Sequence, residues 1–311
     1  MNTDQNTEKN NLQYYHELEN YFSDFLEQGI CVAYSGGVDS TLLLKAAVDC
    51  AKHANEDFTC EQAAAPSDRT LYADQNTADG QKRASTVLPV LAVILETQLH
   101  PHSDIEQAQK KAAALGAQPI VIQIDEFQNP LLLHNPKDRC YLCKHLLFSR
   151  LKELAASRGY RALFDGTNKD DELEYRPGMK ALAELQIKSP LRELGITKTQ
   201  VRAISSALGL STATIPSTPC LATRLPYGAI LDRELLARIH QGELLLRDMG
   251  FYNVRLRYHA PILRLEIDSE FFTKLLSCRA TVLNAMKKLG FSYITLDLEG
   301  FRSGSMDIGL I

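Results

Sequence analysis

The sequence contains no hydrophobic run that approaches the roughly 18 residues needed for a membrane-spanning helix. Residues 1–11 are polar and lack the apolar core of a signal peptide. Basic residues are not in excess either, since 34 Lys and Arg stand against 38 Asp and Glu. A dedicated nucleic-acid-binding protein usually carries a basic surplus. We therefore expect a cytoplasmic protein that binds neither membranes nor nucleic acid.

The chain has no internal repeat, and its seven cysteines are an odd number without an export signal. This usage indicates a reducing compartment, in which cysteines serve as thiols or metal ligands. The composition, 45% hydrophobic and 23% charged over 311 residues, is typical of a globular protein with roughly two domains.

Apolar strand patterns alternate with helical patterns up to about residue 208. We expect strands at 30–34, 87–95, 119–124 and 161–164, with helices at 12–28, 38–52, 103–115, 141–158 and 198–208. Strands separated by helices predict an α/β fold, a parallel sheet with helices on both faces. A different pattern follows residue 228, with helices at 232–249 and 270–289 and strands at 253–259, 262–267 and 293–298. This second pattern predicts a small α+β domain.

The predicted domain organisation follows from these patterns. Residues 1–11 form a flexible tail, 12–215 the α/β domain, 216–228 a hinge that contains Cys220, and 229–311 an α+β domain for substrate binding and oligomerisation. Within the first domain, residues 55–86 are polar and without periodicity, so we expect a long surface loop there.

The most informative segment is an apolar strand that runs into a short turn and then directly into a helix. Its turn reads S-G-G-V-D-S and contains Ser35, Gly36, Gly37, Asp39 and Ser40. Such a turn directs backbone N–H groups and the positive end of the helix at an anion above the strand. The glycines allow close approach of the backbone, and the Asp39 carboxylate can hold Mg²⁺. The segment therefore predicts a phosphate or pyrophosphate site.

The turn differs from the common phosphate loop, which requires a lysine beside its Ser or Thr. It resembles instead the S-G-G-x-D-S signature of the PP-loop ATP pyrophosphatases. That resemblance implies a PP-loop domain at 12–215 that binds ATP with Mg²⁺ and cleaves it into AMP and pyrophosphate. A second turn, containing Gly166 and Thr167, follows the strand at 161–164 and looks like the G-T-N segment that these enzymes place near the nucleotide.

Three cysteines are candidates for chemistry. Cys140 and Cys143 form a C-x-x-C near the start of a helix, so both thiols face one side, and the surrounding pattern is not thioredoxin-like. Cys220 lies in an irregular segment with Arg224 nearby, where a reactive thiolate is favoured. The three thiols together suit a 4Fe-4S cluster with one open iron, and zinc bound by three Cys and His145 is the alternative.

Arg255 and Arg257 alternate along a predicted strand and therefore project from the same face. With Arg302 they could bind a phosphate in a bidentate manner. The alternative is an ordinary solvated face.

Taken together, these motifs resemble the LarE-type family of ATP-dependent sulfur transferases, which act in nickel-pincer nucleotide cofactor biosynthesis. The resemblance rests on the turns at 35–40 and 165–170, the C-x-x-C, the segments 174–178, 220–228 and 254–257, and the segment 300–304. It covers nearly the whole chain except the tail and the 55–86 loop.

The resemblance implies that the enzyme adenylates a carboxylate of pyridinium-3,5-biscarboxylic acid mononucleotide and replaces the AMP with sulfur. The sulfur donor is either Cys220 itself, which becomes dehydroalanine, or a 4Fe-4S cluster on Cys140, Cys143 and Cys220. It also places Arg224, Glu243, Arg255, Arg257 and Arg302 at the substrate or its phosphate. The resemblance also implies a trimer-based homo-oligomer, either a trimer or a hexamer.

Two other functions remain as alternatives. A PP-loop tRNA thiolase also joins a C-x-x-C to a third cysteine, but the charge balance and the lack of a basic, aromatic-rich segment oppose it. A non-catalytic iron–sulfur or zinc protein would not need the intact motif at 35–40.

Overall fold

The computed structural model describes residues 2–63, 87–100, 105–173, 177–213 and 220–302. The chain divides into two compact units. The first contains residues 1–95, 104–122 and 144–217, and the second contains residues 96–103, 123–143 and 218–311. The described helices include none that is both long and apolar enough to cross a membrane.

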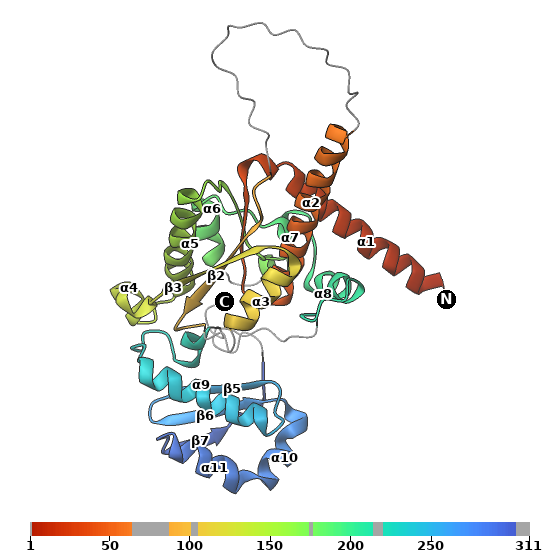
Figure 1. The fold of residues 1–311 in the computed structure, drawn as a ribbon. Coiled ribbons are helices and arrows are strands. Elements are labelled where there is room, and N and C mark those ends of the chain that lie inside the picture. The colour runs from red at the N-terminus through yellow and green to blue at the C-terminus, as the bar shows by residue number, and fades with distance from the viewer. Residues whose placement is uncertain (1, 64–86, 101–104, 174–176, 214–219, 303–311) are drawn as a thin grey trace, which may run out of the picture. The chain divides into compact units, whose positions relative to one another are not determined.

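The first unit is built on a four-stranded sheet in the order β3-β2-β1-β4 (Figure 1). The strands are β1 (Ile30–Ala33), β2 (Leu91–Thr97), β3 (Gln118–Ile124) and β4 (Ala162–Phe164). β1 pairs in parallel with both β2 and β4. The expected α/β fold with a parallel sheet is therefore confirmed.

Both faces of this sheet are covered. The helices around it are α1 (Asn2–Ser23), α2 (Val38–Ala63), α3 (Ile105–Leu115), α5 (Arg139–Ser157), α6 (Gly178–Glu184), α7 (Pro190–Glu193) and α8 (Lys198–Ala207). Alternate strand residues such as Val32 and Phe164 join a core with α1, α2, α3 and α8, whereas Cys31 and Leu163 are buried on the other face. This continuous burial explains the unbroken apolar runs in the sequence.

The second unit contains a three-stranded mixed sheet in the order β5-β6-β7 (Figure 1). Its strands are β5 (Val254–His259), β6 (Ile262–Ile267) and β7 (Tyr293–Leu296), and its helices are α4 (Pro130–Leu133), α9 (Arg233–Asp248), α10 (Phe272–Ser277) and α11 (Arg279–Lys288). β5 and β6 are antiparallel, whereas β6 and β7 are parallel. One sheet face carries Leu256 and Leu265 into the core, and the opposite face carries Arg257 and Glu266.

Short 3₁₀ helices complete both units: η1 (Leu26–Gln28), η2 (Glu126–Gln128), η3 (Lys169–Leu173), η4 (Leu221–Arg224) and η5 (Ser269–Phe271). The second unit also includes residues 96–103 and 123–143, which the sequence pattern placed in the first domain. The physical reason is packing, because Leu99 and Phe127 contribute to the apolar cluster of the second unit.

Two segments differ from the expected tail and loop. α1 begins at Asn2, so residues 2–11 are helical rather than a flexible tail, and α2 continues to Ala63, past the expected end near residue 52. Neither extension has apolar periodicity. A nucleated helix adds residues at low cost, and residues 53–63 are rich in helix-forming Ala, Glu and Gln. The rest of the expected loop, 64–86, and residues 216–219 of the hinge lie outside the described residues.

The predicted helix at 270–289 is divided into η5, α10 and α11. The division between α10 and α11 lies at Cys278, which has φ −105° and ψ 17°. Apolar spacing alone does not reveal such a break, because the same face of both helices packs on the core.

Candidate active site

The loop between β1 and α2 is folded by the hydroxyl groups of Ser35 and Ser40. The Ser40 hydroxyl accepts from the Ser35 N–H at 3.2 Å and donates to the Gly37 carbonyl at 3.2 Å. The Gly37 N–H donates to the Ser35 hydroxyl at 3.3 Å. Gly36 has φ 73°, a conformation that favours glycine. The loop thus forms a tight turn at the amino end of α2, where backbone N–H groups and the helix dipole attract an anion.

Gly166 packs directly against the start of α2. A Cβ atom at this position would lie 3.1 Å from the Ser40 nitrogen and 3.2 Å from the Asp39 Cβ. The turn after β4 therefore meets the turn after β1 at the carboxyl end of two paired parallel strands. This is the edge at which open α/β sheets bind ligands.

The Asp39 carboxylate is held from two sides. The Lys198 ammonium, at the start of α8, forms an ion pair with Oδ2, and the Asn168 side-chain amide donates to Oδ1 at 3.2 Å. The Asp39 side chain is 20% exposed, so solvent still reaches it. Carboxylate oxygens are ligands that Mg²⁺ prefers, and the adjacent ammonium suits a polyphosphate. The residues present therefore fit Mg²⁺ with a nucleotide.

Thr167 supports the second turn from within. Its hydroxyl donates to Asp165 Oδ2 at 2.5 Å, and the Ser189 hydroxyl donates to Oδ1 at 2.5 Å. Lys144 Nζ lies 3.7 Å from Asp165 Oδ2. Asp165 and Thr167 are both buried. Thr167 was predicted to contact the nucleotide, and in this structure its hydroxyl fixes the turn that carries Gly166.

The second unit contains all three predicted cluster cysteines. Cys140 and Cys143 lie at the start of α5, the first exposed and the second buried, and Cys220 directly precedes η4. Burial raises the pKa of Cys143 well above its usual value, and negative charge on Cys220, Glu126 and Cys140 raises it further. Charges on both Cys140 and Cys220 therefore act on the Cys143 thiol.

In the part of the chain that the structure describes, these thiols are not arranged to hold a single metal ion such as zinc. Among the described residues, no group of three or more His, Cys, Asp or Glu side chains is placed to hold a metal ion. The donor set suits a 4Fe-4S cluster chemically, because three thiolates leave one iron open. Cys140, Cys143 and Cys220 are the residues that would hold such a cluster, whose open iron would carry the sulfur that is transferred.

The Cys220 thiol is favoured over the thiolate in this structure. Burial raises the pKa of Cys220, and the positive charges of Arg139 and Arg224 offset only part of that effect. The sequence predicted a thiolate near Arg224; in this structure, desolvation of the half-buried Cys220 outweighs the attraction of the guanidinium groups.

Asn135 joins the cysteine-bearing segments and was not singled out from the sequence. It is fully buried, with φ 45°, and its side-chain amide donates to the carbonyls of Leu225 at 3.1 Å and Pro226 at 2.9 Å. Its Oδ1 accepts from Arg139, whose other nitrogen lies 3.6 Å from Cys140 Sγ. Asn135 thus ties the chain after Cys220 to the start of α5.

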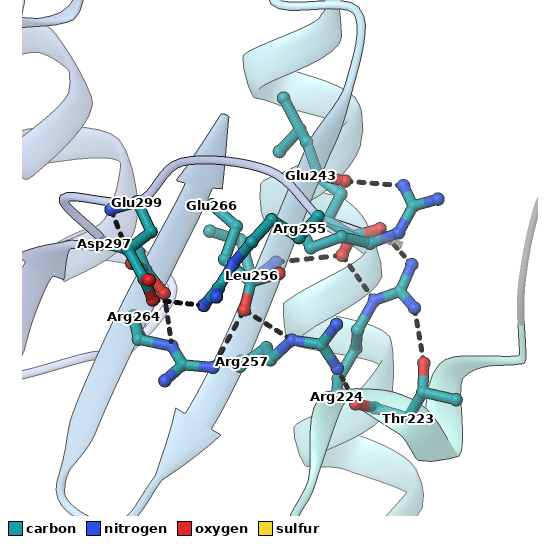
Figure 2. A network of polar contacts seen from close by, with 12 residues as sticks. Thr223, Arg224, Glu243, Arg255, Leu256, Arg257, Arg264, Glu266, Asp297 and Glu299 are labelled. Atoms are coloured by element: carbon teal, nitrogen blue, oxygen red, sulfur yellow. Dashed lines mark hydrogen bonds and ion pairs between the residues drawn. The ribbon is translucent and has the colours of Figure 1, made fainter. Parts of the chain in front are cut away.

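Arg224 and Glu243 form a buried ion pair, and both side chains are only 1% exposed. Arg224 donates to the two Glu243 carboxylate oxygens at 2.6 and 2.9 Å, and the backbone N–H of Leu256 donates to Glu243 at 3.0 Å (Figure 2). Gly242 allows this contact, because a Cβ there would come within 2.6 Å of Leu256 Cδ1. Arg224 and Glu243 therefore bind each other, although both were predicted to contact substrate.

Arg255 and Arg257 project from the same face of β5 and have different surroundings. Arg257 donates to Glu266 Oε1 at 2.6 Å and to the Thr223 carbonyl at 2.5 Å. Arg255 donates to the Val254 carbonyl at 2.7 Å and lies over the Phe301 ring, and within the described part of the chain it makes no ion pair. Burial, followed by the charge of Arg224, lowers the pKa of Arg255 to about 10.

We call the surrounding network the arginine cluster. It consists of Arg224, Arg247, Arg255, Arg257, Arg264 and Arg302 together with Glu243, Glu266, Asp297 and Glu299. Arg302 pairs with Glu299 at 2.5 Å, while its Nε is buried and unpartnered. Six arginines and four carboxylates leave a net charge of +2 among these described residues. The charge complements a dianionic phosphate.

The chain is similar over most of its length to a named enzyme. A pyridinium-3,5-bisthiocarboxylic acid mononucleotide synthase of Lactiplantibacillus plantarum is 34% identical over 280 residues, which cover 90% of this chain and 89% of the relative. The chain belongs to the LarE-type family. This membership agrees with the resemblance carried by the motifs.

Two uncharacterised proteins are also similar. A protein of Synechocystis is 35% identical over 278 residues, covering 89% of this chain and 91% of the relative. A protein of Methanocaldococcus jannaschii is 26% identical over 279 residues, covering 90% and 93%. No protein-family model matches the chain.

Lys198 and Asn135 are site residues that the sequence did not reveal, whereas Asn168 belongs to the G-T-N segment expected near the nucleotide. Lys198 stands in a Thr197–Gln200 capping box, which signals a helix start and nothing about phosphate. Their roles depend on contacts with residues far away in the chain, such as Asp39 for Lys198.

Proposed function

We propose that this LarE-type protein is an ATP-dependent sulfur transferase of nickel-pincer nucleotide cofactor biosynthesis. It adenylates a carboxylate of pyridinium-3,5-biscarboxylic acid mononucleotide, releases pyrophosphate and converts the acyl adenylate into a thiocarboxylate. The sulfur comes from Cys220 or from a 4Fe-4S cluster on Cys140, Cys143 and Cys220. The working form is a trimer-based homo-oligomer, either a trimer or a hexamer.

The observation that carries the proposal is the junction of Gly166 with Asp39 and Ser40 at the amino end of α2. The 35–40 turn binds the pyrophosphate through backbone N–H groups, and Ser35 and Ser40 keep its shape. Lys198 exchanges its ion pair with Asp39 for one with the phosphates when the nucleotide binds. Asp39 would hold Mg²⁺, which would supply positive charge to stabilise the leaving pyrophosphate.

The residues for the acyl half of the reaction belong to the second unit. The arginine cluster carries the net positive charge that a mononucleotide phosphate requires. Among the described residues, no carboxylate uses all the hydrogen-bonding capacity of Arg255 and Arg302. When Cys220 is the donor, its sulfur attacks the acyl carbon, AMP leaves, and cleavage of the Cβ–S bond yields thiocarboxylate and dehydroalanine. The thiol proton and a Cα proton leave to solvent, so no oxidant is required.

Product analysis tests the adenylation step. Wild-type protein with ATP and the biscarboxylic acid mononucleotide should release AMP and pyrophosphate, and it should release neither when the mononucleotide is omitted. Asp39→Asn should lower this rate by about a hundredfold or more, because metal stabilisation of the charge is worth several kcal/mol. Asp49→Asn, further along α2, is the matched control and should retain the rate. Formation of ADP and phosphate would contradict the proposal.

A further inference from the structure

Thr223 connects Cys220 to the arginine cluster. Its hydroxyl donates to the Cys220 carbonyl at 2.7 Å and accepts from Arg224 Nη1 at 2.7 Å. Its own carbonyl accepts from Arg257 Nη1 at 2.5 Å (Figure 2). One residue therefore bonds to the donor cysteine and to two arginines at the same time.

The Cys220 carbonyl has several donors, which fix the turn that begins there. The Thr223 N–H donates to it at 3.1 Å in addition to the Thr223 hydroxyl, and Arg224 Nη1 lies 3.5 Å from it. Arg224 is itself fixed by its bidentate ion pair with the fully buried Glu243. The position of Cys220 is thus set through η4 by residues of α9 and β5.

A phosphate that accepts hydrogen bonds from Arg257 competes with the present partners of that guanidinium. That guanidinium already serves Glu266 and the Thr223 carbonyl, and it lies beside Arg255 on the same strand face. A dianion at Arg257 would change the hydrogen bond to the Thr223 carbonyl, and the Thr223 hydroxyl is bonded to the Cys220 carbonyl.

We propose that Thr223 is a positioning residue that couples phosphate occupancy of the arginine cluster to the placement of the Cys220 thiol. The inference rests on the proposed function, because it takes the arginine cluster as the substrate phosphate site and Cys220 as a sulfur-handling residue. Its consequence is that Cys220 reaches its reactive placement only when a phosphate-bearing substrate is bound.

The test measures the alkylation rate of Cys220 by iodoacetamide, resolved from the other cysteines by peptide mass spectrometry. The protein is compared in inorganic phosphate and in chloride of equal ionic strength. The wild-type rate should change by about fivefold or more, the lower end of typical coupling between sites. Thr223→Val keeps the shape but removes the hydroxyl, and its rate should change by less than about twofold. Thr223→Ser should restore the response.

Two further measurements distinguish a positioning role of Thr223 from a general effect on folding. The phosphate affinity of Thr223→Val, measured calorimetrically, should stay within about twofold of wild type, because the backbone carbonyl that meets Arg257 remains. In turnover, Thr223→Val should lower kcat while KM for the mononucleotide is little changed. Thr281→Val, an exposed threonine on α11, is the control for a general effect of the substitution.

Each outcome has one meaning. An equal phosphate response in Thr223→Val and wild type refutes the coupling. If phosphate binds the wild-type protein without changing the alkylation rate of Cys220, the coupling is also refuted, but the proposed sulfur transfer is not affected. If inorganic phosphate does not bind wild type but binding of the mononucleotide is normal, both the coupling and the assignment of the arginine cluster are wrong.

Discussion

Glu243 is the residue on which most of the arginine cluster depends. Its carboxylate binds Arg224 with two hydrogen bonds, accepts from the Leu256 N–H, and lies 3.4 Å from Arg247. Burial raises the pKa of Glu243, but the hydrogen bonds and charge of Arg224 outweigh burial and bring it below the ordinary value of 4.5. A buried ion pair of this kind is costly to break from one side, since the remaining charge has no partner.

We predict that Glu243→Gln lowers the free energy of unfolding by about 3–5 kcal/mol at neutral pH, the usual cost of breaking a buried ion pair. Because the folded pKa is depressed, this stabilisation is present above the ordinary carboxyl pKa of 4.5 and is lost as pH falls through the folded value. The difference between variant and wild type in urea unfolding should therefore shrink in acid. Glu234→Gln, exposed in the first turn of α9, should leave the unfolding free energy unchanged. A pH-independent difference would show that the Glu243 charge is not responsible.

A substitution at Arg255 distinguishes an effect on substrate binding from an effect on the stability of the protein. We predict that Arg255→Met weakens mononucleotide binding by about tenfold to a hundredfold, since hydrogen bonds to a charged group contribute about 1.5–3 kcal/mol. The melting temperature should not fall, because the guanidinium is desolvated without an ion pair among the described residues and its pKa is lowered to about 10. Isothermal titration and thermal unfolding measure the two effects. Arg238→Met, exposed on α9, serves as control, and equal affinity in both variants would return Arg255 to a structural role.

At the scale of elements, the proposed nucleotide site is formed where two turns contact each other. The turn after β1 and the turn after β4 approach so closely that a Cβ at Gly166 would lie 3.1 Å from the Ser40 nitrogen and displace it by a few tenths of an ångström. The S-G-G-x-D-S motif therefore depends on a second segment about 130 residues further along, and β1–β4 pairing brings the two together.

We predict that Gly166→Ala displaces the first turn of α2 by a few tenths of an ångström and weakens ATP binding. The added Cβ would stand 3.1 Å from the Ser40 nitrogen, so the unfolding free energy should fall by about 1–3 kcal/mol, as in other overpacked sites. Gly159→Ala is the matched control. It has φ 84° and open space around the Cβ, so it should lose about 1–2 kcal/mol through backbone strain while ATP affinity stays the same. Equal loss of ATP affinity in both variants would contradict the packing argument.

The helices and strands of both units were largely predictable. β6 and the start of α8 coincide with the predicted ranges, because their apolar periodicity and caps are local signals. The predicted helix at 270–289 was in fact three pieces, because the break at Cys278 leaves the apolar face in place. The helical residues 2–11 and 53–63 escaped prediction because their polar character carries no periodicity.

At the scale of the whole molecule, the two units carry different halves of the proposed reaction. The first holds the 35–40 turn, Gly166 and Lys198, and the second holds the three cysteines and the arginine cluster. The residue range 123–143 belongs to the second unit, and this assignment is what groups Cys140 and Cys143 with Cys220.

The mass of the polypeptide after one turnover identifies the sulfur donor. We predict that anaerobically reconstituted protein binds about four irons per chain, and that Ser in place of Cys140, Cys143 or Cys220 lowers both iron content and sulfur transfer. Intact-mass analysis after turnover then gives the contrast. An unchanged polypeptide mass supports the cluster as donor, whereas loss of the mass of hydrogen sulfide from Cys220 identifies the cysteine. Ser in place of buried Cys50, remote from these thiols in sequence and in the other unit, is the control.

The sequence by itself determined the α/β class, the phosphate-binding turn, the C-x-x-C and the family, because each is written in contiguous residues or in short-range periodicity. Tertiary structure decided which groups are free to act. Arg224, Glu243, Arg255 and Arg257 look alike as candidate substrate contacts in the sequence, yet folding pairs the first two with each other and leaves Arg255 without an ion pair among the described residues. Lys198, Asn135 and Thr223 became visible only in the fold. The physical reason is that hydrogen bonding and desolvation depend on neighbours far away in the chain, which no local pattern specifies.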